Sequence, residues 1–294
     1  MSGLAVSALP RDRAHRMNTL SQNDLDYIRA LIQRHAAIVL DQDKTYLIEM
    51  RLDSLVRQLG LASLKALVTL LRANLSNDLR DRVVEALVTH ETLFFRDVHP
   101  FEAIKTVILP ELIARRSHGQ SLTIWCAACS SGQEPFSVAM LVREHFPALV
   151  GSRLRIIATD LSDAILARAR QGLYNQIEVN RGLPAALLIK YFTKQGSQWQ
   201  IKPEIQRMVE FQRCNLAAAW PSRPPLDLVF LRNVLIYFST DTKKAILSKI
   251  RTVLKPDGYL FLGSSETTLN LDTAFETVPI GKTLCYQLRS AKDP

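Results

Sequence analysis

The sequence has no apolar run that approaches the ~20 residues of a membrane-spanning helix, so no membrane insertion is expected. Residues 1–17 place a short apolar stretch before their charges, which is the reverse of a secretory signal peptide. Cysteine is scarce, with 4 residues in a chain of 294. Without a signal peptide, so few cysteines favour a reducing compartment over a disulfide framework. We therefore expect a cytoplasmic protein.

Ligands for a metal are also few. Cys126 and Cys129 form a C-x-x-C, the spacing of a redox pair or of half a zinc site. A zinc site needs further ligands at matching spacing, and the sequence has neither a second C-x-x-C nor an H-x-x-x-H. We therefore expect no metal site, and we interpret the two cysteines as small residues at the end of a strand.

The remaining composition is that of an ordinary globular protein, with 47% apolar and 22% charged residues. The length allows one large domain or two smaller ones. Lysine and arginine outnumber aspartate and glutamate by 37 to 28, which gives a formal net charge of +9. Such a balance favours an acidic partner, whether nucleic acid, an anionic membrane or an acidic protein surface, without deciding between them.

The N-terminal part of the chain has the pattern of a small helical domain. Residues 1–17 are interpreted as a disordered basic tail and residues 18–89 as the all-helical domain itself. The first helix is expected to begin at a Ser21 cap. Its expected apolar stripe is Leu25, Ile28, Ile32, Ala36 and Val39. The caps expected for two later helices are Ser63 and Ser76.

Between these lies an amphipathic helix predicted over about residues 44–59. Lys44, Arg51 and Arg57 sit beside or opposite its apolar stripe. They are candidates for a basic edge that contacts an acidic partner helix, although a solvated face is the commoner outcome for such charges.

Residues 90–117 are interpreted as a linker followed by the first helix of the next domain. The linker contains THETLFFRD, which sets Thr92 and Arg96 at positions i and i+4, so that a hydroxyl and a guanidinium point together from one turn. Such a guanidinium can grip a carboxylate with two hydrogen bonds. A packed segment with a surface arginine is the alternative. The helix after it, over residues 99–116, is expected to be interrupted at Pro110.

The centre of the chain is LTIWCAACSSGQEPF, residues 122–136. It reads as a buried strand, a loop of small residues and the start of a helix, the first unit of a doubly wound sheet. Gly132 is its only glycine, so it is neither a dinucleotide fingerprint nor a phosphate loop. Glu134 at the helix start would repel a phosphate but suits an amine. The loop therefore favours a cofactor with a positive group, or else is an ordinary turn with a dipole-matched glutamate.

Two later strands end in polar residues. Asp160 ends the second strand of the α/β pattern, where an acidic residue is placed to bind two ribose hydroxyls. Arg232 and Asn233 follow a core strand at residues 226–231, with Tyr237 just beyond. Strands separated by helices imply a mostly parallel α/β sheet.

The α/β domain is assigned to residues 118–294, with an insertion at about residues 173–213. Within the insertion, SQWQIKPEI and RMVEFQRC alternate like short antiparallel strands. Near the C-terminus, PDG is expected to turn, and LCYQL is expected to close the sheet.

Six motifs follow the helical region in a fixed order: THETLFFRD, CAACSSGQEPFS, IIATDLSDAILARAR, the NL pair, LRNVLIYF and LKPDGYLFLGSSE. Together they resemble the chemotaxis receptor methyltransferase family, CheR, over roughly residues 20–290. The resemblance implies an N-terminal helical domain and a class I S-adenosylmethionine-dependent (Rossmann-like) methyltransferase domain with a small antiparallel β-subdomain. It implies methyl transfer to glutamate side chains of methyl-accepting chemotaxis receptors, with S-adenosylhomocysteine as the product.

The resemblance also implies roles for individual residues. Arg96 and Tyr237 would be catalytic, with Tyr237 near the transferred methyl. The cofactor-binding residues would be His90, Thr92, Arg96, Glu134, Asp160, Asn215, Leu216, Arg232 and Asn233. Glu134 would take the cofactor's ammonium, Asp160 its ribose, and Asn215 with Leu216 would flank the adenine.

Two features of the sequence depart from the family pattern. His90 stands where many relatives have asparagine, and the segment YFTKQGSQWQIKPEI is shorter and poorer in glycine than in relatives that dock on a receptor's C-terminal pentapeptide. We therefore expect weak docking of such a pentapeptide or none.

Two other functions are alternatives to this one. The first is a methyltransferase of nucleic acid or of another acidic protein. Against a nucleic-acid substrate, LRNVLIYF lacks the Pro-Pro-aromatic turn typical of enzymes that methylate base amino groups. The other is a cofactor-binding signalling module without turnover.

Overall fold

The computed structural model describes residues 20–73, 77–116, 120–151 and 153–289. The chain divides into two compact units, with the first ending at Thr89 and the second beginning at His90. The expected basic tail and the Ser76 cap lie outside the described residues. In the part of the chain that is described, no helix is both long and apolar enough to cross a bilayer, and no group of three or more His, Cys, Asp or Glu is arranged to hold a metal ion.

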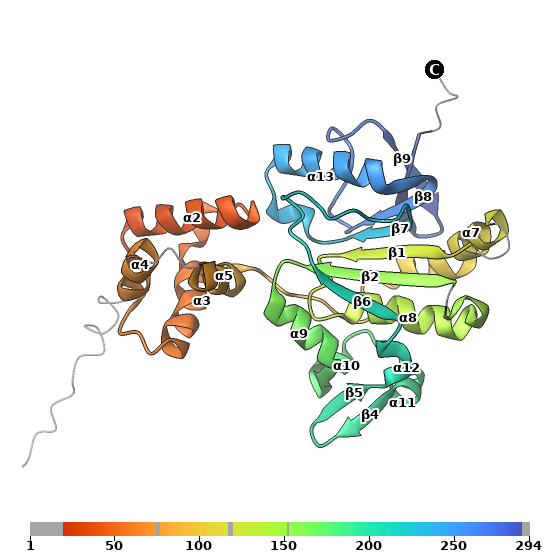
Figure 1. Ribbon diagram of the computed structural model, residues 1–294, viewed down its shortest axis with the longest axis horizontal. Coiled ribbons are helices and arrows are strands. Elements are labelled where there is room, and N and C mark those ends of the chain that lie inside the picture. Colours follow the sequence, from red (N-terminus) through yellow and green to blue (C-terminus); the bar gives the residue numbers. More distant parts are fainter. Residues whose placement is uncertain (1–19, 74–76, 117–119, 152, 290–294) are drawn as a thin grey trace, which may run out of the picture. The chain divides into compact units, whose positions relative to one another are not determined.

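The first unit is built from helices (Figure 1). They are amphipathic, and their apolar side chains form its buried core. Its elements are α2 (Gln22–Ala36), a 3-10 turn (Gln42–Lys44), α3 (Thr45–Gln58), α4 (Leu64–Ala73) and α5 (Asn77–Leu87). Ser21 caps α2 as predicted, because its hydroxyl accepts the Asp24 N–H. The prediction that Val39 continues the apolar stripe of this helix is wrong. The helix α2 ends at Ala36, Ala37 adopts a left-handed conformation, and Val39 is 46% exposed.

Arg51 on α3 has a structural task inside this unit. Its guanidinium donates to the Leu87 carbonyl at 2.6 Å and to the Thr89 hydroxyl at 3.0 Å. It therefore satisfies the C-terminal end of α5, where carbonyls lack partners within the helix. Arg57 is 74% exposed in its side chain and pairs only along the helix surface, with Asp53 at 3.1 Å.

The second unit contains a seven-stranded sheet in the order β6-β2-β1-β7-β8-β10-β9. Its strands are β1 (Leu122–Ala127), β2 (Leu154–Asp160), β6 (Val209–Arg213), β7 (Leu226–Leu231), β8 (Leu254–Leu262), β9 (Phe275–Ile280) and β10 (Thr283–Leu288). The strands from β6 to β8 are parallel, and β10 is antiparallel to both of its neighbours. The mostly parallel α/β sheet is therefore confirmed, and β1 and β7 lie side by side at its centre.

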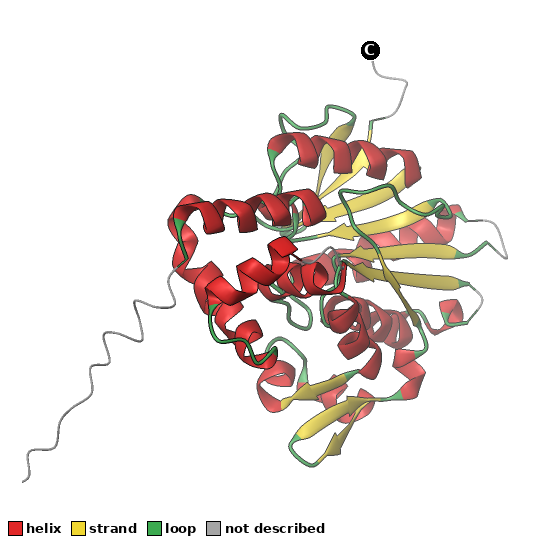
Figure 2. Ribbon diagram, turned by 60° about the vertical axis from the view of Figure 1, so that its left-hand side comes forward, coloured by secondary structure: helices red, strands yellow, loops and turns green. Residues whose placement is uncertain are grey.

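Helices connect these strands and cover the sheet, as Figure 2 shows by element type. They are α6 (His99–Ala103), a π-helical turn (Ile104–Ile108), α7 (Leu109–Arg115), α8 (Gln133–His145), a 3-10 turn (Pro147–Leu149), α9 (Asp163–Gln171), a 3-10 turn (Leu235–Tyr237) and α13 (Thr240–Val253). The chain leaves β1 through α8 toward β2, and leaves β7 through α13 toward β8. The two connections run in opposite directions across the sheet. Because crossovers between parallel strands are right-handed, α8 and α13 therefore lie on opposite faces of the sheet.

The interruption expected at Pro110 takes a different form. The helical run continues through Pro110, and the irregularity lies one turn earlier, where the Leu109 N–H donates to the Ile104 carbonyl. Proline has no backbone N–H and its ring displaces the preceding turn, which the wider π-helical turn accommodates.

A small antiparallel sheet in the order β3-β5-β4 is inserted between α9 and β6. Its elements are β3 (Leu173–Asn175), α10 (Gln176–Asn180), α11 (Ala185–Tyr191), β4 (Phe192–Gln195), β5 (Gln198–Ile201) and α12 (Pro203–Gln206). The segment RMVEFQRC was expected to lie in this insertion, up to residue 213. It instead forms β6, which pairs in parallel with β2 at the edge of the large sheet. Its alternating pattern suits a strand with one exposed face in either sheet, so the pattern alone cannot distinguish them.

The C-terminal strands also differ from expectation. The PDG turn is a bulged excursion within β8, between the pairs Leu226 with Leu254 and Leu228 with Tyr259. LCYQL forms the greater part of β10, which is not the edge of the sheet, because β9 pairs on its outer side. β9 was not predicted, and its Pro279 is tolerated because an edge strand can leave an N–H position unpaired.

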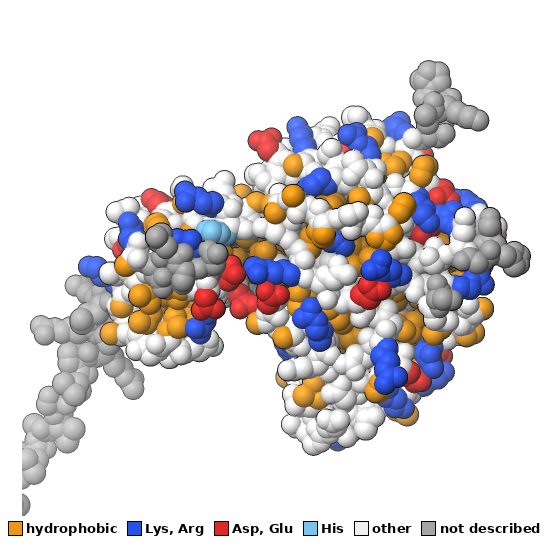
Figure 3. Space-filling view, in the orientation of Figure 1, with side chains coloured by type: hydrophobic (Ala, Val, Ile, Leu, Met, Phe, Trp, Pro, Cys, Tyr) orange, Lys and Arg blue, Asp and Glu red, His pale blue; other side chains and the backbone are white. Residues whose placement is uncertain are grey.

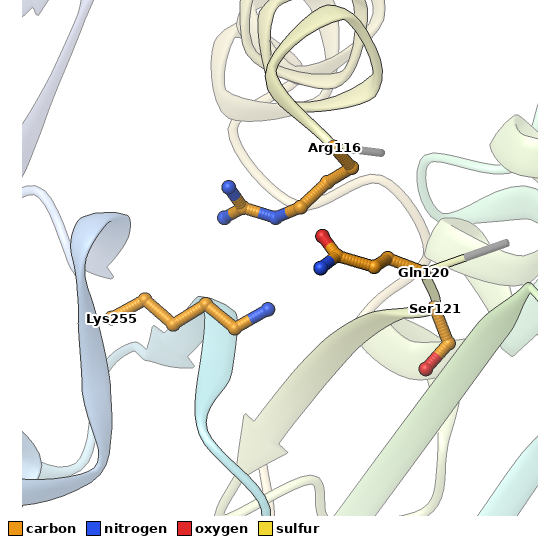
Figure 4. A pocket seen from close by; sticks show the side chains of 4 residues that line it. All are labelled: Arg116, Gln120, Ser121 and Lys255. Carbon is orange, nitrogen blue, oxygen red and sulfur yellow. The ribbon is translucent and has the colours of Figure 1, made fainter. Parts of the chain in front are cut away.

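Charged residues meet at the amino ends of the central strands, far along the sheet from the strand ends that bind ligands in this architecture. Asp227 is fully buried and accepts from Arg116 at 2.6 Å, from Lys255 at 2.8 Å and from the Thr123 N–H at 2.8 Å. Figure 4 shows Arg116 and Lys255 pointing into the hollow that they line with Gln120 and Ser121. Both cations are already paired with acids, so we interpret this cluster as structural.

Candidate active site

The loop after β1 is shaped by its backbone. Ala128, Ser130 and Gly132 have φ values of 54°, 51° and 92°. A Cβ at Gly132 would lie 3.1 Å from Phe136 and 3.2 Å from Ala169, so both the conformation and the close approach of α8 and α9 favour glycine. Two N–H groups of the loop, those of Cys129 and Ser130, donate to Thr159 and Asp160 at the carboxyl end of β2.

Asp160 lies at the end of β2, as predicted, and ties two loops together. Its carboxylate accepts the Ser130 N–H at 2.8 Å and the Ser162 N–H at 3.2 Å. A carboxylate has about four lone-pair positions, so these two bonds leave capacity for ligand hydroxyls. The Cys214 N–H donates to the Asp160 backbone carbonyl at 2.9 Å, which places Asn215 directly after this strand end.

Glu134 and Arg232 meet where the sheet reverses direction, between β1 and β7. Arg232 donates to the Glu134 carboxylate at 2.9 Å, and the Arg232 side chain is only 1% exposed. Burial raises the pKa of Glu134, while the charge and hydrogen bond of Arg232 act to lower it. This crevice is the position at which open α/β sheets bind their ligands.

Arg232 also holds the segment that precedes α6. It donates to the Arg96 carbonyl at 3.0 Å and to the Asp97 carboxylate at 2.5 Å. This segment is not a helical turn, because Phe95, Asp97 and Val98 all have positive φ. The argument that Thr92 and Arg96 share a helical face is therefore wrong, since i and i+4 neighbours meet only on a helix.

Arg96 is half-buried as a residue, and its guanidinium donates to the Glu91 carbonyl at 3.1 Å. Arg96 also acts on Glu134 electrostatically, lowering the pKa of that carboxyl. Arg96, Glu134 and Arg232 therefore form one charged group. Thr92 is half-buried in the same segment.

Several buried polar atoms of the site lack partners among the described residues. They are His90 Nε2, Arg232 Nε and Asn233 Oδ1. A buried polar atom without a partner costs roughly 1–3 kcal/mol. Such atoms therefore fit a polar ligand that supplies the missing hydrogen bonds. The backbone of His90 is tied to the loop after β1, because its carbonyl accepts from Ser130 Oγ at 2.9 Å.

Asn215 and Leu216 are held by a second set of contacts. Asn215 Oδ1 accepts the Ala217 N–H at 3.0 Å, and Leu216 is 6% exposed. Lys249 donates to the Leu216 carbonyl at 2.5 Å. Burial lowers the pKa of this lysine.

Sequence reasoning missed two acids of the site, Asp97 and Glu266. Glu266 follows β8, and its carboxylate accepts from the N–H groups of Asn233 and Ile236. Tyr237 lies at the end of the same short 3-10 turn and is half-buried. An acidic residue just after a strand, as in LFLGSSE, is the signal that was available for Glu266.

A pocket of about 400 Å³ adjoins this group. It lies among the segment before α6, the end of β8 and the start of β10. Its lining residues are Asp97, His99, Pro100, Arg232, Leu262, Gly263, Ser264, Glu266, Lys282, Thr283, Leu284 and Tyr286.

Comparison with known proteins adds a family to this geometry. Residues 90–284 match the model of the CheR methyltransferase SAM binding domain, and residues 23–88 match that of the CheR methyltransferase all-alpha domain. The chain belongs to the CheR methyltransferase family. It is therefore a methyltransferase that uses S-adenosylmethionine, with a class I fold preceded by an all-helical domain.

Curated relatives match over nearly their whole length. Chemotaxis protein methyltransferase Cher2 of Pseudomonas putida is 41% identical over 270 residues, which is 90% of this chain and 98% of that protein. Chemotaxis protein methyltransferase 1 of Pseudomonas aeruginosa is 42% identical over the same shares. Among solved structures, a TehB-like SAM-dependent methyltransferase from Corynebacterium glutamicum matches with a TM-score of 0.37 and 13% identity, covering 64% of this chain and 85% of that chain.

Proposed function

We propose that this protein is a protein-glutamate O-methyltransferase that forms methyl esters on methyl-accepting chemotaxis receptors during sensory adaptation. The observation that carries the proposal is the buried pair of Glu134 and Arg232 at the switch point of the sheet. Glu134 supplies an anion for the cofactor's ammonium, and the neighbouring arginines supply cations that attract carboxylates. Family membership and the chemotaxis methyltransferases among its relatives support the same reaction.

In this proposal the cofactor lies across the carboxyl ends of β7, β1 and β2. Glu134 takes the ammonium, and Asp160 accepts hydrogen bonds from the ribose while it holds the loop after β1. The remaining cofactor contacts are assigned to His90, Thr92, Arg96, Asn215, Leu216, Arg232 and Asn233. His90 Nε2 and Asn233 Oδ1 are each a buried atom that such a ligand would satisfy.

S-adenosylmethionine supplies a methyl group on a sulfonium, and a glutamate oxygen of the receptor displaces it in line. Free glutamate has a pKa of about 4.3, so this nucleophile is ionised at neutral pH and needs no general base. The protein's work is therefore orientation, which can supply roughly 7–11 kcal/mol. We assign Arg96 to orient a carboxylate and Tyr237 to shape the channel to the methyl.

Receptor helices are the proposed partner of the first unit. Of the expected basic edge, Arg51 is committed to the end of α5, and only the backbone of Lys44 is described. Arg57 is exposed, and the apolar side chains Tyr46 and Met50 of the same helix are 65% and 60% exposed. We therefore assign docking to a mixed face of α3 made of Tyr46, Met50 and Arg57.

Docking of a receptor's C-terminal pentapeptide is not part of the proposal. The turn between β4 and β5 is only two residues long, Gly196 and Ser197, so the small sheet lacks the longer glycine-rich turn of tail-docking relatives. The cytoplasm, where receptor signalling helices lie, is the proposed location.

A methyltransferase of nucleic acid is the weaker candidate. On the face of the second unit in Figure 3, basic side chains are scattered, and several lie beside acidic ones. Ion pairs of this kind include Arg155 with Glu210 and Arg168 with Glu178. A strand-tracking stripe of unpaired cations would instead be typical of nucleic-acid binding.

The proposal is tested by incubating the protein with methyl-labelled S-adenosylmethionine and a receptor cytoplasmic fragment. Label on the receptor that alkali releases as methanol is the expected result, because esters are base-labile and methylated amines are not. A tRNA or DNA acceptor and a fragment-free sample are the controls. Cofactor binding without transfer would instead favour a signalling module that does not turn over.

A further inference from the structure

We infer that Glu266 is a positioning residue for methyl transfer, which fixes the backbone of residues 233–237 and thereby the place of Tyr237. The inference rests on the proposed function, in which Tyr237 shapes the channel to the methyl. Glu266 belongs to the loop after β8, and it acts through hydrogen bonds to main-chain groups.

The carboxylate of Glu266 joins the ends of two neighbouring strands. Oε2 accepts the Asn233 N–H at 2.7 Å, after β7, and the Gly263 N–H at 2.6 Å, after β8. Oε1 accepts the Ile236 N–H at 3.2 Å, within the 3-10 turn that ends at Tyr237. Glu266 is 9% exposed, so these bonds are largely shielded from water.

The segment that Glu266 holds does not have a self-sustaining backbone. Asn233 has a φ of 56°, a left-handed conformation open to few residues other than glycine, asparagine and aspartate, and its N–H donates to Glu266 rather than to a neighbour in the chain. The turn at Leu235–Tyr237 is a single 3-10 turn, and its N-terminal N–H groups need partners from outside. Glu266 supplies the acceptors for both, so its removal frees the segment between Arg232 and Tyr237.

Gly263 shows independently that the two strand ends are closely fitted here. A Cβ on Gly263 would lie 2.7 Å from Asn233 Nδ2, 2.8 Å from Glu266 Oε2 and 2.9 Å from the Asn233 backbone nitrogen. Real contacts of a Cβ are longer, so alanine would push the same segment away from β8. Gly263→Ala is thus a second perturbation, which keeps the charge of Glu266 but displaces the groups around it.

Among the described residues, Glu266 makes no hydrogen bond or ion pair to Arg96, Glu134 or Arg232, and acts on this group only through its charge, which raises the pKa of Glu134. It is therefore assigned a positioning role. Arg232 is anchored separately by Glu134 and Asp97. Loss of Glu266 should therefore disturb Tyr237 more than the arginine, and turnover more than cofactor binding.

The test compares Glu266→Gln with Glu276→Gln, a matched change on the exposed edge strand β9. In Glu266→Gln an amide NH2 replaces one acceptor oxygen and faces backbone N–H groups. We expect kcat to fall about 10- to 100-fold, the scale of a misplacement near 1 Å. The KM for S-adenosylmethionine should rise by less than the factor by which kcat falls, because Asn233 is itself a proposed cofactor contact. The protein should remain folded, with a thermal midpoint lowered by only a few degrees.

A double-mutant cycle with Tyr237→Phe separates positioning from a general loss of structure. If Glu266 acts through Tyr237, the double variant should be no slower than about the slower single variant, because residues that act as a unit are not additive. Gly263→Ala should show the same lack of additivity.

Three results would overturn the inference. The first is a normal kcat in Glu266→Gln while Tyr237→Phe is slow, and the second is a double variant whose kcat falls by the product of the two single effects. The third is a fall in kcat that is fully explained by a smaller folded fraction of the variant. Failure of the proposed function is distinguished from these, because the wild type itself would then leave no base-labile label on the receptor fragment.

Discussion

The Tyr174 hydroxyl donates a hydrogen bond to the Ser131 carbonyl at 2.7 Å, which joins strand β3 of the small sheet to the loop after β1. Tyr174 is fully buried, and its ring packs edge-on against Phe94 at a centroid distance of 5.1 Å. Phe94 in turn belongs to the segment that carries Arg96. The small sheet is thus packed directly against both loops of the proposed cofactor site.

Replacing Tyr174 by phenylalanine tests this connection. The change keeps the ring but leaves the buried Ser131 carbonyl without its donor, so we expect a loss of roughly 1–3 kcal/mol in the free energy of unfolding. Cofactor affinity should also fall, because the loop after β1 loses a support. Urea unfolding and a cofactor titration measure both effects. Tyr27→Phe, in the first unit, is the control, and equal losses in the two variants would contradict the connection.

The raised pKa of Glu134 predicts a pH dependence of cofactor binding. Burial raises this pKa, and only the ionised carboxylate pairs with an ammonium. Affinity should therefore be highest well above that pKa and should fall as the pH decreases from neutral through it. Calorimetric titrations at several pH values measure this trend. Glu134→Gln should bind more weakly and lose the dependence, whereas an unchanged slope in that variant would assign it to another group.

Arg96→Ala should impair catalysis with little effect on folding. Within the described residues, the hydrogen bond of its guanidinium is to the Glu91 carbonyl, near the surface. A hydrogen bond to a charged group contributes about 1.5–3 kcal/mol, so kcat/KM should fall roughly 10- to 150-fold. A rise in the KM for the cofactor would indicate that Arg96 grips the cofactor's carboxylate. A rise in the KM for the receptor would indicate that Arg96 grips the carboxylate of the receptor glutamate.

The matched control for this prediction is Arg96→Lys, which keeps the charge but not the two-pronged geometry. It should lie between the wild type and Arg96→Ala. Near-normal kcat/KM for both substrates in Arg96→Ala would reject the assignment.

Asp227→Ala should destabilise the second unit without touching the cofactor site. It would leave Arg116 and Lys255 without their shared buried partner, and breaking a buried ion pair costs roughly 3–5 kcal/mol. Asp257→Asn is the comparison, because Asp257 pairs with the same Arg116 but its side chain is 34% exposed. A smaller loss in Asp227→Ala than in Asp257→Asn, measured by urea unfolding, would show that the cluster is not a structural centre.

The short turn between β4 and β5 predicts no tail docking. Titration of a receptor C-terminal pentapeptide against the protein should give no binding in the micromolar range. A scrambled peptide is the control, and micromolar binding that it does not reproduce would contradict the prediction.

The sequence was informative where function depends on the ends of individual strands. Asp160 and Arg232 could be placed because buried apolar runs mark β2 and β7, and parallel strands bring their carboxyl ends to one edge. The α8 start was equally local, with small residues before it and Pro135 in its first turn.

What could not be predicted depends on pairing over long distances. β6 has the same alternation as a strand of the small sheet, and only its pairing with β2 decides its place. The positive φ values at Phe95 and Val98 occur at bulky and β-branched residues that rarely adopt them, so no local pattern predicts that turn. Glu266 and Asp97 belong to the site through contacts with residues 30 or more positions away.

The central claim is tested most directly by locating the transferred methyl on a receptor fragment by peptide mass spectrometry. After incubation with S-adenosylmethionine, the account predicts a mass increase of one methylene on glutamate side chains of the signalling helices. The Arg96→Ala variant should give a much smaller modified fraction at the same time point. A modification at lysine, at a terminus or on nucleic acid, or none on a receptor that binds the protein, would contradict the account.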